Sequence, residues 1–309
     1  MNSCFDSKQY IELTQKLLSK TAEQVFGKLY VEVEGKLLKD DFASRVLPGY
    51  EADNKKKLIT HFKSEAAILV CINADAIINN QLFTRKGIPC VQYLELSLKR
   101  IETATGIKPQ LVITNINMEE MYDIIFSIES KFQKKGYRVW EHYQQRGFLS
   151  NKRLLSELGL GGNDHIPLEK KIIFVTGIGE EAGAFRTCMS QLYLDHEIGI
   201  ESSFCMLQTF PIPELGKDHP LHQARNARKK DRILIQQEDG KTIEDSTLTN
   251  FKFLKSVLGK YLPHTNLIHN YSKPSEMLIA PILDAVTDMH LVEQAAHKEL
   301  ESLSTRSSY

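Results

Sequence analysis

The chain has 309 residues, of which 42% are hydrophobic and 25% are charged, a composition typical of a folded globular protein with a substantial core. Its 39 Lys and Arg residues balance its 39 Asp and Glu residues, so net charge gives no reason to expect nucleic acid or an anionic membrane surface as a partner. No apolar run approaches the length of a membrane span, and the five cysteines are too scattered for a disulfide framework or a zinc site. These features predict a cytoplasmic protein without a metal centre.

The first half of the chain alternates the patterns of strands and helices. An amphipathic helix is predicted for residues 6–26, and the alternating stretch KLYVEVEGK predicts a strand exposed on one face. Buried strands follow in AAILVCINA, QLVITNI and YRVWEHY, separated by helices predicted for residues 90–105 and about 119–134. Such alternation indicates an α/β fold whose parallel sheet is covered by helices on both faces.

A stretch rich in Gly, Asn and Pro predicts a boundary in the middle of the chain. We expect an N-terminal α/β unit over residues 1–150, a linker over 151–170, and a second α/β unit with C-terminal helices over 171–309. The fold class predicted is therefore two Rossmann-like three-layer units with mainly parallel sheets, of which the second is P-loop-like.

The second unit opens with KIIFVTGIGEEAGAFRTCMS, the stretch around which the chain is organised. It predicts a buried strand, a glycine-rich turn and a helix, the arrangement in which backbone N–H groups cradle a phosphate. The candidate ligand-binding residues of this turn are Gly177, Gly179, Gly183 and Thr187. A Walker A loop would require lysine where Ala184 stands, and the two acidic residues of the turn would repel a polyphosphate. A plain strand-to-helix turn that needs positive φ explains the glycines as well.

Other polar residues in turn-prone or basic stretches are candidates for binding an anion. Ion-paired or solvated side chains account for the same residues, and Ser275 is also a candidate helix N-cap, so both interpretations stay open. The additional candidate ligand-binding residues are Arg45, His219, Arg225, Lys273 and Ser275. No spacing of histidines, cysteines or carboxylates predicts a metal site, and no catalytic residue is indicated.

Several segments together resemble the UPF0371 proteins, also called the DUF1846 family. The matching pieces are KLYVEVEGKLLKDDFASRVLPGYEAD, ILVCINADAI, IIFVTGIGEEAGAFRTCMSQLYLDHEIGI, LQTFPIPEL followed by His219-Pro220, and YSKPSEMLIAPILDAVTD. SRVLPG and TC-x-SQLY are the most specific of them. The resemblance implies a bacterial, intracellular α/β protein without an assigned activity, with a P-loop-like second unit and a further C-terminal domain that this chain lacks.

The chain departs from the family pattern at three positions. The family loop ends in Gly-Lys before TC-x-SQLY, whereas this chain has Ala184 in the lysine position and Glu181 in place of a loop glycine. A histidine that precedes ASRVLPG in the family is Phe42 here. The scaffold is thus expected to be retained while its phosphate chemistry is weakened or lost.

Two functional hypotheses follow. The first is that the strand ends bind a phosphorylated small molecule, such as a nucleotide with Mg²⁺; an enzyme of this kind would be a phosphotransferase or a hydrolase. The second is a non-catalytic module that binds a protein partner. The C-terminal stretch EQAAHKELESLSTRSSY resembles the signals of effectors exported by type IV secretion systems, and it equally fits the end of a helix.

Overall fold

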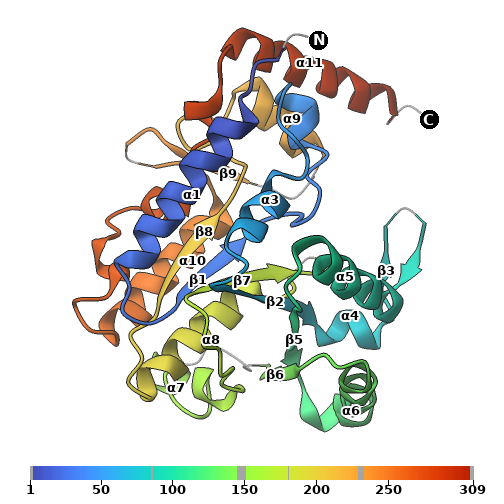
Figure 1. Cartoon of the computed structure of the whole chain (residues 1–309), viewed down its shortest axis with the longest axis vertical. Coiled ribbons are helices and arrows are strands. Elements are labelled where there is room, and N and C mark those ends of the chain that lie inside the picture. Colours follow the sequence, from blue (N-terminus) through green and yellow to red (C-terminus); the bar gives the residue numbers. More distant parts are fainter. Residues whose placement is uncertain are drawn as a thin grey trace.

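The computed structural model describes residues 3–84, 86–144, 151–179, 181–228, 233–237 and 239–306. Seven strands of this described part form one parallel sheet in the order β11-β8-β1-β7-β2-β5-β6 (Figure 1). Their bounds are β1 Leu29–Val33, β2 Ala66–Asn73, β5 Gln110–Ile116, β6 Val139–Tyr143, β7 Ile172–Gly177, β8 Ser203–Leu207 and β11 Leu278–Ile279. Two small antiparallel pairs complete the strands: β3 Leu82–Phe83 with β4 Ile88–Pro89, and β9 Leu234–Gln236 with β10 Thr242–Glu244.

Helices connect these strands and cover both faces of the sheet (Figure 1). They are α1 Ser7–Glu23, α2 Ala43–Val46, α3 Asn54–His61, α4 Ala74–Ile78, α5 Cys90–Thr105, α6 Met118–Lys134, α7 Asn151–Leu154, α8 Ala184–Glu197, α9 Pro220–Arg228, α10 Asp245–Ser256 and α11 Met289–Arg306. Short 3-10 turns lie at Leu160–Gly162, Leu258–Lys260, Leu267–Asn270, Pro274–Met277 and Leu283–Ala285.

The core is built around strands with apolar residues on both sides. Seven of the eight residues of β2, AAILVCIN, are buried, as expected of a central strand in a parallel sheet. Phe62, which ends α3, lies against Phe174 of β7 on one face, with 6.4 Å between ring centroids. On the other face, Phe185 of α8 meets Phe204 of β8 edge to face at 5.6 Å. The helices α3 and α8 therefore cover opposite faces of the sheet.

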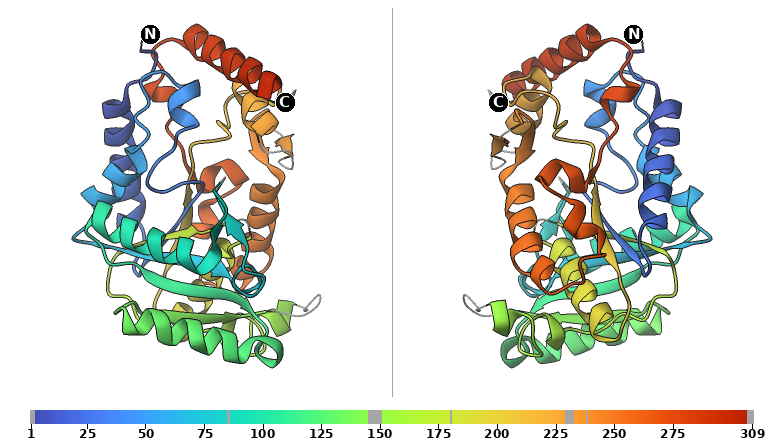
Figure 2. Two further views of the ribbon diagram at one scale, coloured as in Figure 1. Left: turned by 90° about the vertical axis from the view of Figure 1, so that its right-hand side faces the viewer. Right: turned by 90° about the vertical axis from the view of Figure 1, so that its left-hand side faces the viewer.

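A second, smaller hydrophobic cluster lies beyond the carboxyl ends of the strands. It gathers the N-terminal segment, α2, α9 and α11, with fully buried side chains such as Val46, Leu221 and Val292. α11 packs against α9 and α2 at one end of the molecule, far from α6 at the other end (Figure 2). We call this cluster the cap.

The predicted α/β class with a parallel sheet is confirmed. Strands from both sides of the predicted linker lie in the same sheet, because β7 is inserted between β1 and β2. The division into units at residues 151–170 stays a prediction, and residues 145–150 lie outside the described residues. The prediction that KLYVEVEGK is exposed on one face is wrong: β1 lies between β7 and β8, and α8 covers the face that carries its charged residues.

Candidate functional site

The connections that follow the neighbouring strands β1 and β7 lie on opposite faces of the sheet. After β1 the chain passes over the α3 face to reach β2, whereas after β7 it passes through α8 on the other face to reach β8 (Figure 1). Ligands of open α/β sheets bind beside the carboxyl ends of the strands at such a topological switch point. We therefore describe the β1–β7 switch point as the candidate site.

The glycine-rich turn lies on the β7 side of the switch point. Gly183 is the N-cap of α8 at φ +81°, and Gly179 has φ +88°, conformations that side chains other than glycine rarely adopt. The helical hydrogen bonds of α8 begin with the one that Thr187 N donates to the carbonyl oxygen of Gly183 at 2.9 Å. The N–H groups of Ala184 and Phe185 precede that bond, and no partner for them is recorded among the described residues.

The turn is also packed tightly against the protein. Thr114 of β5 donates a hydrogen bond to the carbonyl oxygen of Ala182 at 2.9 Å, and a Cβ placed on Gly183 would lie 2.8 Å from the Thr114 hydroxyl. A Cβ on Gly179 would lie 2.8 Å from the ring of Phe83, which belongs to the β3–β4 hairpin. Close packing thus explains two of the glycines without a ligand.

Thr187, which was predicted to bind the ligand, faces inward. It is fully buried, and its hydroxyl lies 3.4 Å from both Cys71 Sγ and His142 Nδ1. Burial lowers the pKa of His142 to about 4, so the ring is neutral at physiological pH. In this structure Thr187 anchors α8 to β2 and β6.

Glu32 of β1 is a candidate that the sequence did not single out. It follows Tyr30 by two residues, and Tyr30 contacts α8, so Glu32 projects on the α8 face. Its residue surface is only partly covered, yet its Oε2 is buried and has no hydrogen-bond partner among the described residues. Burial, and then the neighbouring Glu34, raise the pKa of Glu32 to about 8. The carboxyl is therefore largely protonated at pH 7.

Arg225 of α9 reaches the same edge of the sheet from the cap. Its Nη2 donates to Glu34 Oε1 and to the carbonyl oxygen of Phe210, both at 2.8 Å, and its Nη1 forms an ion pair with Glu244. The residue is 6% exposed. Arg225 thus lies near the end of β1, where two carboxylates already engage its guanidinium, and its assignment to a ligand stays a prediction.

Lys55 of α3 is a second basic residue near the end of β1. Its Nζ donates to the carbonyl oxygen of Glu34 at 2.7 Å and lies 3.4 Å from Asp40 Oδ2. The side chain is 2% exposed. Like Arg225, it fastens the segment that follows β1 rather than presenting a free charge.

The other predicted residues are dispersed. Arg45 pairs with Glu299 at 3.0 Å within the cap, where His219 also lies, its Nε2 3.6 Å from Glu293. Burial is the main cause that lowers the pKa of His219. Lys273 forms an exposed ion pair with Asp239, and Ser275 has a buried hydroxyl without a recorded partner in the described structure. The structure does not gather these residues around the glycine-rich turn, and their assignment to a ligand stays a prediction.

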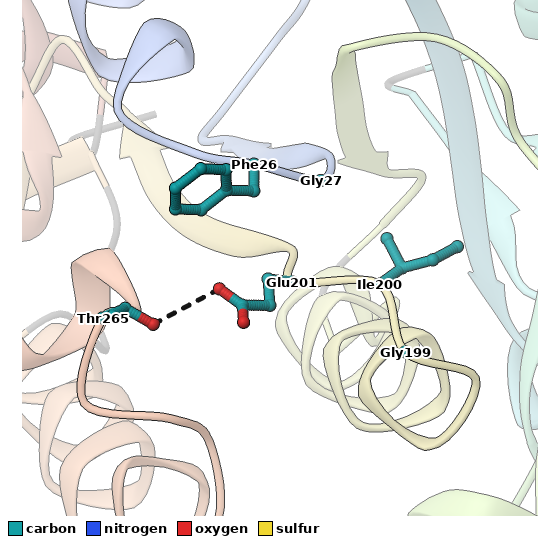
Figure 3. A pocket seen from close by; sticks show the side chains of 6 residues that line it. All are labelled: Phe26, Gly27, Gly199, Ile200, Glu201 and Thr265. Carbon is teal, nitrogen blue, oxygen red and sulfur yellow. Dashed lines mark hydrogen bonds between the residues drawn. The ribbon is translucent and has the colours of Figure 1, made fainter.

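A shallow pocket lies at the opposite edge of the sheet, before β1 and β8 (Figure 3). Its lining comprises Phe26, Gly27, Gly199, Ile200, Glu201 and Thr265. The hydroxyl of Thr265 donates to Glu201 at 3.3 Å, and the lining contains no basic side chain. A phosphate would therefore find no positive charge in this pocket.

The described residues contain no group of three His, Cys, Asp or Glu side chains arranged to hold a metal ion. None of their helices is both long enough and apolar enough to cross a membrane.

The family model of the N-terminal part of DUF1846, a domain of unknown function, matches residues 3–303. The chain belongs to the DUF1846 family. A UPF0371 protein of Streptococcus thermophilus is 30% identical over 306 residues, which cover 96% of this chain and 60% of that relative. A UPF0371 protein of Streptococcus pyogenes serotype M5 is 34% identical over 228 residues, covering 74% and 46% of the two chains. The chain thus spans about 60% of the length of the Streptococcus thermophilus relative.

Proposed function

We propose that the chain binds a phosphorylated small molecule, with a nucleotide as the first candidate, at the β1–β7 switch point. The observation that carries the proposal is the glycine-capped start of α8 at the carboxyl end of β7, where the N–H groups of Ala184 and Phe185 have no recorded partner among the described residues. Such groups, together with the helix dipole, attract a phosphate. A phosphate there would also lie beside the end of β1.

The side chains around the turn set the strength of binding. Ala184 supplies no charge where a P-loop has lysine, and Glu181 is exposed within the turn. The two buried basic residues nearest the end of β1, Lys55 and Arg225, are already held by protein acceptors. Backbone groups are therefore the main source of affinity, and we expect dissociation constants in the high micromolar to millimolar range. We do not assign catalysis or Mg²⁺ to this site.

Calorimetry with inorganic phosphate, AMP, ADP and ATP tests the proposal. Ala184→Lys should tighten the binding of the best ligand by about tenfold, because it adds a cation at the start of α8. Ala295→Lys is a matched control: it introduces the same charge at a similarly half-buried alanine of α11, in the cap. The proposal fails if neither the wild type nor Ala184→Lys binds any of the four compounds at millimolar concentration, or if both variants gain affinity equally.

A second candidate function, binding of a protein partner, is favoured by the surface of α6. Tyr122 and Phe126 stack on each other with centroids 6.2 Å apart while remaining 55% and 58% exposed. Exposed aromatic pairs are more typical of interfaces than of solvated helix faces. A Tyr122→Lys, Phe126→Lys double variant should lose a partner that crosslinks specifically to wild-type α6. Retention of that partner by the double variant would exclude this surface.

A further inference from the structure

Glu32 occupies a place in the sheet where a charged residue is costly. In the register of the parallel sheet it lies between Val175 of β7 and Met206 of β8, and on its own face it lies close enough to Cys188 of α8 for its charge to raise the pKa of that thiol. Asn, Ser or Thr would fit such a place with less desolvation. A glutamate in this position therefore calls for an explanation beyond packing.

Among the described residues, the groups near Glu32 do not compensate its charge. Glu34, which follows β1, adds a like charge, although that carboxylate is paired with Arg225. From β2 and α8 the titratable groups near it are the thiols of Cys71 and Cys188, which burial keeps protonated and whose pKa values the Glu32 charge raises further. No cation is recorded beside Glu32 in the part of the chain that the structure describes. Its Oε2 thus stays buried without a partner inside the described protein.

The register of the sheet also places Glu32 near the glycine-rich turn. Val175, its neighbour in register, stands two residues before Gly177, where the glycine-rich turn begins. Cys188, the pKa of whose thiol is raised by the Glu32 charge, belongs to the second turn of α8, one turn after the N–H groups of Ala184 and Phe185, which have no partner among the described residues. The carboxyl and the start of α8 therefore border the same switch point, one from β1 and one from β7.

We infer that Glu32 is a proton-dependent specificity residue: in its neutral form it donates a hydrogen bond to the anionic group of the ligand, and in its ionised form it repels that group. This inference rests on the proposed function, because it requires an anion at the start of α8. The chemistry is a plain hydrogen bond from the carboxyl O–H to a phosphate oxygen, in which no covalent bond changes. Burial supports it by raising the pKa of Glu32 to about 8, close enough to physiological pH for the proton to respond.

The sign of the pH dependence follows from this arrangement. Below pH 8 Glu32 holds its proton and the ligand binds; above pH 8 binding requires the uptake of one proton from solution. A phosphomonoester such as AMP is already a dianion above about pH 6, so its own charge does not change in that range. The affinity for AMP should therefore fall by about 20- to 30-fold between pH 7.5 and pH 9.5.

Calorimetry with AMP over this pH range, in buffers of different ionisation enthalpy, tests the inference. Wild type should take up close to one proton for each AMP bound at pH 9. Glu32→Gln should bind AMP with similar affinity throughout the range and with no proton uptake, because the amide nitrogen donates at every pH. Glu201→Gln removes the same charge at the opposite edge of the sheet and should keep the wild-type profile.

The outcomes separate this inference from the proposed function. AMP binding by wild type that is constant from pH 7.5 to 9.5 would overturn the role of Glu32 and leave the proposed function standing. Proton release on binding would also overturn it, because Glu32 would then pair with a cationic group of the ligand. If AMP, inorganic phosphate and ATP all fail to bind at pH 6.5, where Glu32 is neutral, the anion site itself is disproved.

Discussion

Two carboxyl groups lie between α8 and the sheet, Asp195 near the amino ends of the strands and Glu32 near their carboxyl ends, and the protein surrounds them very differently. Asp195, near the end of α8, is fully buried and accepts hydrogen bonds from Lys28 Nζ at 2.6 Å, Ser202 Oγ at 2.6 Å and Tyr30 OH at 3.0 Å. His165 Nε2 completes the shell at 2.9 Å. Four side chains from three segments of the chain thus converge on one carboxylate.

Glu32 lies only two residues beyond Tyr30 on the same strand, yet among the described residues it has none of these partners. A carboxyl that serves stability is normally satisfied by the protein around it, because an unmade hydrogen bond in a buried place costs free energy. The contrast indicates that the amino edge of the sheet, at Asp195, is built for stability. At the carboxyl edge, Glu32 Oε2 has no hydrogen-bond partner among the described residues.

The largest effect is expected from Asp195→Ala. The substitution leaves the Lys28 ammonium, whose side chain is 8% exposed, without its counter-ion, and it also frees three other donors. Breaking a buried pair from one side typically costs about 3–5 kcal/mol, so we expect the free energy of unfolding to fall by about 4 kcal/mol. Urea denaturation at pH 7 measures the change.

Asp239→Ala is the matched control for that measurement, since Asp239 forms an exposed pair with Lys273 at 2.7 Å. Its cost should stay below about 1 kcal/mol. Equal effects for the two substitutions would mean that the hydrogen-bonded groups around Asp195 contribute no more to the free energy of unfolding than a surface ion pair does.

Hydrophobic pattern alone predicted the α/β class and placed the glycine-rich turn between a strand and a helix, where the structure has β7 and α8. The hydrophobic pattern could not predict the order of the strands in the sheet, because an apolar run specifies a strand but not its neighbours. Nothing local in KIIFVTG indicates that β7 lies between β1 and β2.

The candidate site was predicted only in part, for a related reason. Lys28 and Glu32 alternate with apolar residues, which is the usual pattern of a half-exposed strand. The pattern therefore predicted that the face of β1 with these two residues contacts solvent, whereas in the structure it contacts α8. Only tertiary structure shows that Lys28 meets Asp195, 167 residues away, while Glu32 has no such partner among the described residues. The charge of Arg225 was visible in the sequence, but its two carboxylate partners come from distant segments.

Arg225→Met tests whether the ion pairs of Arg225, at the carboxyl edge of the sheet, stabilise the fold. The substitution preserves the apolar stem but removes the cation shared by Glu34 and Glu244, along with a hydrogen bond to Phe210. We expect a loss of about 3 kcal/mol in the free energy of unfolding, measured by the urea midpoint. Arg228→Met on the same helix, where the side chain is 37% exposed, should cost less than about 1 kcal/mol. A loss for Arg225→Met no larger than that of its control would contradict a structural role.

The smallest effect, and the one that most sharpens the contrast with Asp195, is a gain of stability in Glu32→Gln at alkaline pH. Glu32 has an ordinary pKa of 4.5 and a folded-state pKa of about 8. Between these two values the folded chain holds a proton that the unfolded chain releases, so wild-type stability falls as pH rises through this window and levels off above pH 8. Glutamine carries no such proton.

After allowance for the partial exposure of Glu32, we expect the variant to be more stable than wild type by about 2 kcal/mol at pH 9 and equally stable at pH 4. Thermal and urea unfolding at the two pH values measure the difference, with Glu201→Gln as the control that should show none. A variant less stable than wild type at pH 9 would mean that the ionised carboxylate has a stabilising partner and that Glu32 resembles Asp195 after all.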